Sequence, residues 1–241
     1  MSIPVSLSMP TLPASSDRTP QPLVARLLLA RRDSATPTAP RPAVTTGPSI
    51  VPASVLVAAG GTDVEAGAVV VELDIDPDRL DGAAEHRVLR YHVHCTAADL
   101  DDVMALRLPA PITVFVTPDD SDSDAGTLAE TAQALADAGH SPGLIAGQSV
   151  GAVADFLAVL AHTSVGFVAR ARDGAEVLSL LSGTVAALRG DDVRAALANP
   201  DPAALARLIP DAAEAVRDVL LGIEVEDPAQ VEQVLADAGL R

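Results

Sequence analysis

The chain has 241 residues, of which 49% are hydrophobic and only 2% aromatic, and its formal net charge is −17. This length allows one sizeable core of small aliphatic side chains, and the acidic balance argues against nucleic-acid backbones and anionic membranes as partners. All sixteen basic residues are Arg, so the chain has no lysine to form a Schiff base or a P-loop.

A single cysteine, Cys95, excludes an internal disulfide framework and a multi-cysteine zinc site. A lone cysteine fits a reducing compartment, and prolines interrupt the apolar residues near the N-terminus, so we expect a cytoplasmic protein. The apolar run 143–169 is long enough to cross a bilayer, but it contains polar residues and divides at glycines. We therefore interpret it as strand, helix and strand, and expect no membrane association.

The first 48 residues have the composition of a flexible arm, rich in Pro, Ser and Thr. Within it, PLVARLLLARR (22–32) begins with a proline and places Leu23, Leu27 and Ala30 on one helical face. The pattern predicts a short helix over 22–32, with 1–21 and 33–48 mobile around it, followed by a single α/β domain over 49–241.

The body of the chain alternates strands with helices. β-branched runs bounded by Gly, Pro or Asp predict strands over 68–75, 88–95, 112–118, 143–148 and 165–171. Residues 54–59 are a candidate sixth strand. Helical spacing predicts helices over 97–106, 125–138, 151–161 and 175–188, and after Gly190 the pattern is helical only.

Such alternation implies βαβ units and a mainly parallel sheet. We predict an α/β fold, a (β/α)-barrel or an incomplete barrel with a helical C-terminal region. A doubly wound open sheet is the alternative.

Three blocks occur in the order GPSIVPASVL (47–56), GLIAGQSVGAVADFLAVLAHTSVGFVARA (143–171) and LLGIEVEDPAQVEQVLADAGL (220–240). In this order they resemble an uncharacterised family of bacterial proteins, mainly from actinomycetes, that look like (β/α)-barrels. The resemblance extends over about residues 10–241 at low identity. It implies the barrel fold but does not imply a particular reaction.

The chain departs from that family where the family carries a "PFKxTAGLHH" strand. Here the strand is VGFVARARDG: Val168 stands at the Lys position, and 170–173 replace the stretch before the His pair. In barrels such residues lie at the carboxyl ends of strands, where the chemistry takes place. The resemblance therefore implies a degenerate relative that has lost any activity those residues carry.

Gly147-Gln148-Ser149-Val150-Gly151 matches G-x-S-x-G between a predicted strand and a helix, as in a serine-hydrolase nucleophile elbow. His162 is the sole histidine after Ser149, and it ends the helix that the elbow would begin. Ser149 as an ordinary helix cap is the competing interpretation. The same loop could also present backbone N–H groups to an anion.

Arg170 and Arg172 alternate onto one face of their strand, near the Gly147–Gly151 loop. Guanidinium groups bind carboxylates and phosphates but do not transfer protons. We therefore predict a small anionic ligand at Gly147, Gln148, Ser149, Gly151, Arg170 and Arg172, with no cofactor. Surface ion pairs with the many carboxylates are the alternative role of both arginines.

His92 and His94 form H-x-H on one strand face, and Glu72, Asp74 and Asp76 share a face of the preceding strand. Such a set could hold zinc or iron. The alternative is a polar strand face whose histidines are satisfied by carboxylates.

Two classes of function remain open. The first is a non-catalytic or vestigial barrel, a pseudoenzyme that binds a small anion. The second is an enzyme, either metal-assisted through His92 and His94 with acidic residues, or a serine hydrolase at Ser149.

Overall fold

The computed structural model describes residues 21–32, 44–59, 68–77, 79–80, 87–117 and 125–240, and the side chains of 125–127 are not included. Predictions for 1–20 and 33–43 lie outside these residues. The strands are β1 (Leu28–Leu29), β2 (Ile50–Pro52), β3 (Ala68–Glu72), β4 (Arg87–Thr96), β5 (Ile112–Thr117), β6 (Ser141–Leu144), β7 (Phe167–Arg170) and β8 (Leu220–Glu224).

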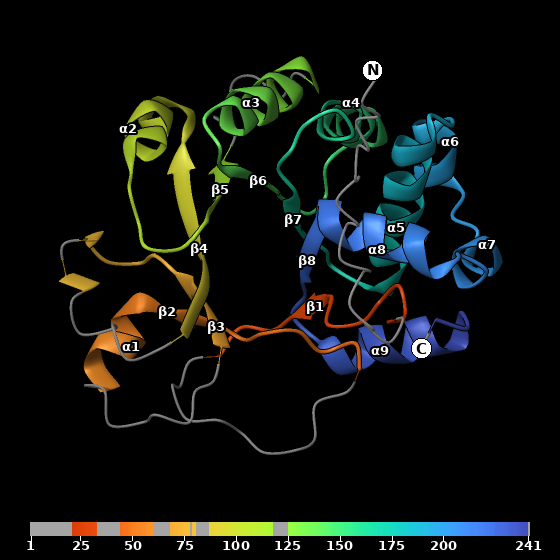
Figure 1. Cartoon of the computed structure of the whole chain (residues 1–241), viewed down its shortest axis with the longest axis horizontal. Coiled ribbons are helices and arrows are strands. Elements are labelled where there is room, and N and C mark those ends of the chain that lie inside the picture. Colours follow the sequence, from red (N-terminus) through yellow and green to blue (C-terminus); the bar gives the residue numbers. More distant parts are fainter. Residues whose placement is uncertain are drawn as a thin grey trace, which may run out of the picture.

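Helices follow most strands and pack around them (Figure 1). They are α1 (Ala53–Ala59), α2 (Leu100–Ala105), α3 (Ala125–Asp137), α4 (Val150–Leu160), α5 (Gly174–Arg189), α6 (Val193–Ala198), α7 (Pro202–Ala206), α8 (Pro210–Val219) and α9 (Pro228–Asp237). A 3-10 turn at Ala97–Asp99 precedes α2.

All eight described strands are parallel and lie in the order β1-β8-β7-β6-β5-β4-β3-β2. The two ends of this order meet, because Ile50 N–H donates to Ala30 O at 2.9 Å and Arg32 N–H donates to Ile50 O at 2.8 Å. These bonds bring β1 beside β2 and nearly close the barrel. The predicted (β/α)-barrel is confirmed, and the open doubly wound sheet is wrong.

The segment 22–32 is not the predicted helix. It forms a turn and then β1, and Leu28 N–H donates to Thr45 O at 3.0 Å while Ile223 N–H donates to Leu27 O at 2.8 Å. Val24 and Leu28 are fully buried. This segment belongs to the barrel because a strand between β8 and β2 buries its leucines on both faces, which outweighs local helical propensity.

Two other expectations are corrected. Residues 54–59 belong to α1 rather than to a strand, and the region after Gly190 is not purely helical because it contains β8. Strand β8 pairs with β7 on one side and β1 on the other.

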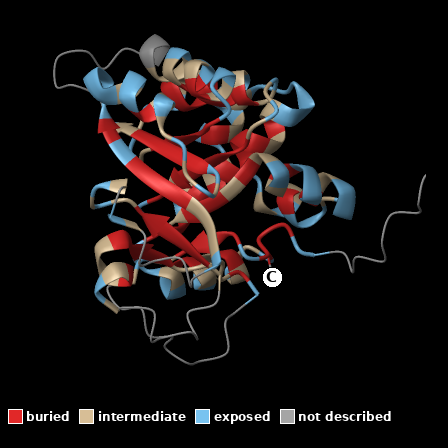
Figure 2. Ribbon diagram, turned by 60° about the vertical axis from the view of Figure 1, so that its left-hand side comes forward, coloured by how far each residue is buried: buried red, intermediate tan, exposed pale blue. Residues whose placement is uncertain are grey.

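The barrel interior and the layer between strands and helices are both apolar. Figure 2 shows the buried residues along the strands and the exposed ones on the outer helix surfaces. The interior cluster contains Leu29, Ile50, Val70, Phe115 and Val168. A larger cluster packs β1, β7 and β8 against α4, α5 and the C-terminal helices.

Because side chains alternate along a strand, the residues two positions after these interior ones also face inward. They include Glu72, two residues after Val70, and Arg170, two residues after Val168. This alternation places charged side chains above the apolar layer, at the carboxyl ends of the strands.

Candidate functional site

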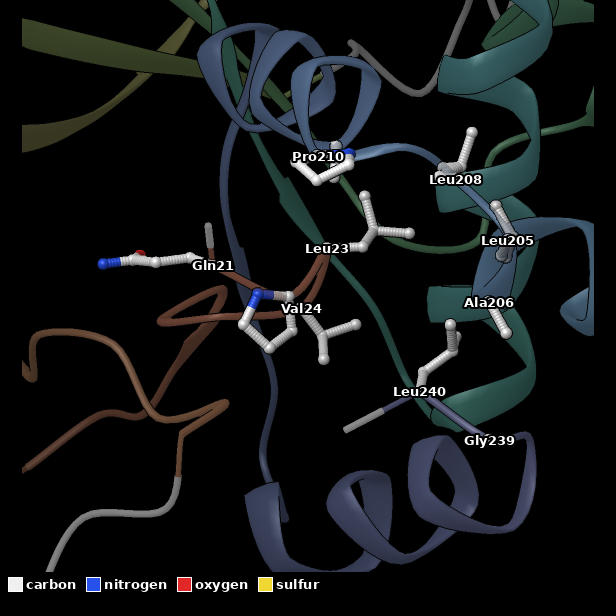
Figure 3. A pocket seen from close by; sticks show the side chains of 11 residues that line it. Gln21, Leu23, Val24, Leu205, Ala206, Leu208, Pro210, Gly239 and Leu240 are labelled. Atoms are coloured by element: carbon white, nitrogen blue, oxygen red, sulfur yellow. The ribbon is translucent and has the colours of Figure 1, made fainter. Parts of the chain in front are cut away.

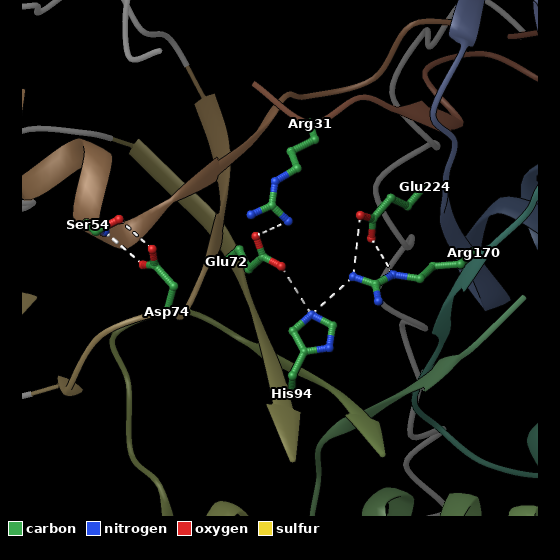
Figure 4. A network of polar contacts seen from close by, with 7 residues as sticks. All are labelled: Arg31, Ser54, Glu72, Asp74, His94, Arg170 and Glu224. Atoms are coloured by element: carbon green, nitrogen blue, oxygen red, sulfur yellow. Dashed lines mark hydrogen bonds and ion pairs between the residues drawn. The ribbon is translucent and has the colours of Figure 1, made fainter. Parts of the chain in front are cut away.

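Five charged or titratable side chains from five strand ends form one network at the carboxyl end of the barrel (Figure 4). Arg31 Nη1 lies 2.5 Å from Glu72 Oε2, and His94 Nε2 lies 3.4 Å from Glu72 Oε1. Arg170 links the other side: its Nη2 lies 3.1 Å from His94 Nε2, and its Nε donates to Glu224 Oε2 at 2.9 Å. We call these five residues the mouth network. (β/α)-barrel enzymes place their chemistry at this end.

His94 is the central member of the mouth network. Its ring stacks on Phe115 with centroids 5.2 Å apart and 15° between planes, and the Arg170 guanidinium lies 4.6 Å from the same ring. Burial and then the charge of Arg170 lower the pKa of His94, while Glu72 and Glu224 oppose that shift. Since a guanidinium only donates, Nε2 of a neutral His94 accepts from Arg170, which assigns the ring proton to Nδ1.

His92 lies deeper on the same face of β4. It is fully buried, and neither ring nitrogen has a hydrogen-bond partner among the described residues. Burial, followed by the charges of Arg90, Arg170 and His94, lowers the pKa of His92 to about 3. The ring meets Phe115 edge-on at 5.3 Å between centroids, so His92 packs as a neutral interior side chain.

The structure does not bring the predicted metal-binding set together. Asp74 accepts hydrogen bonds from the backbone N–H and the hydroxyl of Ser54, while Glu72 is the carboxylate beside His94. Burial raises the pKa of Asp74, but the bonds from Ser54 outweigh it and hold the pKa below its usual value. Asp76, like Asp74, is exposed. Within the described ranges no three His, Cys, Asp or Glu side chains are placed to hold a metal ion.

Ser149 caps α4. Its Oγ accepts from Ala152 N–H at 3.2 Å, which is the geometry of a helix N-cap. His162 follows the far end of α4, a helix that spans about 16 Å. The structure therefore places no histidine from this helix beside Ser149.

The loop before α4 is held by Glu176 of α5. Gly147 N–H donates to Glu176 Oε1 at 2.9 Å, and Arg172 N–H donates to Glu176 Oε2 at 2.8 Å. The Arg172 Nε also lies 3.2 Å from Oε2. Gly147, at φ +80°, allows this turn. The chain's own carboxylate thus occupies the Gly147 amide that we expected an external anion to use.

Arg170 and Arg172 converge on a cleft of about 300 Å³ between the end of β6 and the helices α4 and α5. Arg170 also faces the mouth network, whereas the guanidinium of Arg172 lies beside Gly147. The charged and polar lining residues are Gln148, Arg170, Arg172, Asp173, Glu176 and Ser179. Leucine, isoleucine, valine and alanine side chains line the rest of the cleft.

A second hollow of about 300 Å³ lies near the start of β1, lined by Leu23, Val24 and Leu240 with residues of α7 and α8 (Figure 3). It lies where a barrel strand begins rather than ends. In this fold that end contributes to stability and the opposite end to chemistry.

Sequence reasoning missed three residues of these sites. Arg31 lay in a segment interpreted as an arm, and Glu224 lay in a region interpreted as helical. Glu176 had one usable signal, its i,i+4 spacing from Arg172.

A comparison with protein-family models, curated proteins and solved structures finds no match to this chain. In the part of the chain that the structure describes, every helix is too short or too polar to cross a bilayer.

Proposed function

We propose that this chain is a non-catalytic binding protein derived from a (β/α)-barrel, and that it holds a small anionic ligand at Arg170 and Arg172. The observation that carries the proposal is that both arginines line one ligand-sized cleft at the carboxyl end of the barrel. Guanidinium groups bind carboxylates and phosphates through paired N–H donors.

The internal ion pairs leave donors for such a ligand. Arg172 is 71% exposed at its side chain and uses Nε for Glu176, while its terminal nitrogens bond no other described residue. Arg170 is held by Glu224 and His94. Side chains fixed in this way lose little further freedom when a ligand binds.

Two observations support a binding role rather than catalysis. Val168, at the position where the resembling family carries Lys, is fully buried in the apolar interior cluster. Arg170, two residues later, does not transfer protons. Descent from that family is part of the proposal.

A cytoplasmic location belongs to the same proposal. Cys95 is buried and unpaired, which suits a reducing compartment. The net charge of −17 argues against nucleic acid as a partner.

Calorimetric titration with acetate, hexanoate and inorganic phosphate tests the anion site. We expect saturable binding of at least one anion below about 10 mM, weakened at least about tenfold in Arg172→Gln. Arg194→Gln is the matched control, because Arg194 is similarly exposed and pairs with Asp155. Absence of binding, or equal binding by Arg172→Gln, contradicts the proposal.

A metal-assisted enzyme is the second candidate, favoured by the position of His94 Nε2 near Glu72 at the mouth of the barrel. Imidazole and carboxylate are ligands of zinc, manganese and iron. Stoichiometric metal in purified protein, lost in His94→Gln, would replace the non-catalytic proposal with this one.

A further inference from the structure

We propose that the ligand of the cleft at Arg170 and Arg172 is a monocarboxylate with a short hydrocarbon tail. Its carboxylate binds Arg172, and its tail lies on the apolar surface between α4 and α5. This inference rests on the proposed function and names the chemical class of the ligand.

The first observation is the composition of the cleft wall. Its two arginines lie at the end of β7 and in the loop after it, and aliphatic side chains from β6, α4, α5 and α6 supply most of the remainder. The main aliphatic residues are Leu144, Ile145, Val150, Val153, Leu180 and Leu197. Leu144, Val153, Leu180 and Leu197 are already buried, so the apolar surface in contact with water belongs mainly to Ile145 and Val150. A phosphate ion leaves this surface uncovered, whereas an aliphatic tail removes it from water.

The second observation is Val150, the first residue of α4. It is 43% exposed and is one of four large hydrophobic side chains that stand out among the described residues; the others are Val44, Leu188 and Ile209. Of the four, Val150 is the one that lines this cleft. An occupant with an apolar body would cover it.

The third observation is the charge balance of the cleft. Arg170 and Arg172 face Asp173 and Glu176 in the same lining, so two formal positive charges meet two formal negative ones. A dianion would add repulsion from Asp173 and Glu176, and a singly charged carboxylate adds less of it. The planar carboxylate also matches the two parallel donors of a guanidinium.

The volume, about 300 Å³, is at the low end for ligand sites and selects short chains. A six-carbon acid is a suitable probe. Acetate shares its carboxylate, hexan-1-ol shares its tail, and inorganic phosphate shares only negative charge.

Calorimetric titration of the full chain with these four compounds tests the inference. We expect hexanoate to bind at least about tenfold more tightly than acetate, because burial of each methylene adds affinity. Hexanoate should also bind more tightly than hexan-1-ol and phosphate. Arg172→Gln should weaken the binding of both hexanoate and acetate.

Val150→Ser distinguishes the contribution of the hydrocarbon tail to binding from that of the carboxylate. We expect Val150→Ser to weaken the binding of hexanoate and to leave the binding of acetate unchanged. Leu188→Ser, which alters an exposed leucine outside the cleft, should change the binding of neither compound. Both positions are exposed, so both variants should fold.

The outcomes distinguish the two proposals. Phosphate or acetate binding as tightly as hexanoate, with loss in Arg172→Gln, overturns the hydrocarbon inference and keeps the anion site. Equal binding of hexanoate by Val150→Ser also overturns it. If no anion binds, or if Arg172→Gln binds hexanoate as the native chain does, both proposals are wrong.

Discussion

Gly143 lies across the β5–β6 ladder from Phe115, and a β-carbon at this glycine would overlap the phenylalanine ring. The ring is fully buried in the barrel interior, and both His94 and Arg170 lie against it. It therefore has little room to move. The absence of a side chain at Gly143 is what allows a large aromatic ring to fill the barrel and support the mouth network.

We expect Gly143→Ala to lower the free energy of unfolding by about 1–3 kcal/mol, the usual cost of overpacking a core. Gly151→Ala is the control. Its new β-carbon would lie 4.0 Å from Ser149 Oγ in a helix, where alanine should add about 0.5–1 kcal/mol. Urea unfolding measures the free energy of unfolding of both variants. Equal values for Gly143→Ala and Gly151→Ala would show that the Phe115 ring moves freely.

His92 makes stability depend on pH. Burial, with the charges of Arg90, Arg170 and His94, lowers the pKa of His92 in the folded state from 6.5 to about 3. Because the folded pKa lies below the unfolded one, the unfolded chain takes up the proton first. The contribution of His92 to the free energy of unfolding is therefore fully present above about pH 6.5. It falls by up to about 1.4 kcal/mol per pH unit as the pH drops toward about 3.

We expect His92→Leu to lose less stability than the native chain between pH 7 and pH 4.5, measured by urea unfolding at both values. The leucine also removes two buried ring nitrogens that have no hydrogen-bond partner among the described residues. His162→Leu is the control, since His162 is exposed. Identical pH dependence in the native chain and His92→Leu would mean that the folded barrel protonates His92 readily.

The fold was predictable where hydrophobic patterns were long. The runs at 68–75, 112–118 and 165–171 contain β3, β5 and β7, and the runs at 88–95 and 143–148 overlap β4 and β6. Strands β1 and β2 have two and three residues, all buried, so no alternation marks them. Strand β8 follows α8 without a break, and its pattern alone does not separate it from a helix.

The site was predictable only in part, for a related reason. Alternation identified His92 with His94 and Arg170 with Arg172, because a strand imposes a period of two. Which residues meet across the barrel depends on strand order and register. Glu72 reaches His94 because β3 pairs with β4 with Glu72 beside His92, and Glu224 reaches Arg170 because β7 pairs with β8.

The segment 21–32 should be essential for stability, since β1 completes the barrel. Leu28 is fully buried between β8 and Thr46, so we expect Leu28→Ala to cost about 2–5 kcal/mol in urea unfolding. Val44→Ala, at a valine 60% exposed, should change stability by less than about 0.5 kcal/mol. A small effect of Leu28→Ala would show that β1 contributes little to the stability of the barrel.

Glu176 should behave as an internal ligand of the loop before α4. Glu176→Ala leaves the N–H of Gly147 and the guanidinium of Arg172 without their carboxylate, and we expect it to cost about 1–2 kcal/mol because the group is partly exposed. Added acetate can occupy the vacated position and should raise the melting temperature of Glu176→Ala more than that of the native chain. Glu226→Ala, at an exposed glutamate, is the control and should show neither the loss nor the acetate effect. If acetate raises the melting temperatures of the native chain and of Glu176→Ala equally, the backbone N–H groups of Gly147 and Arg172 do not form an anion site with the Arg172 guanidinium.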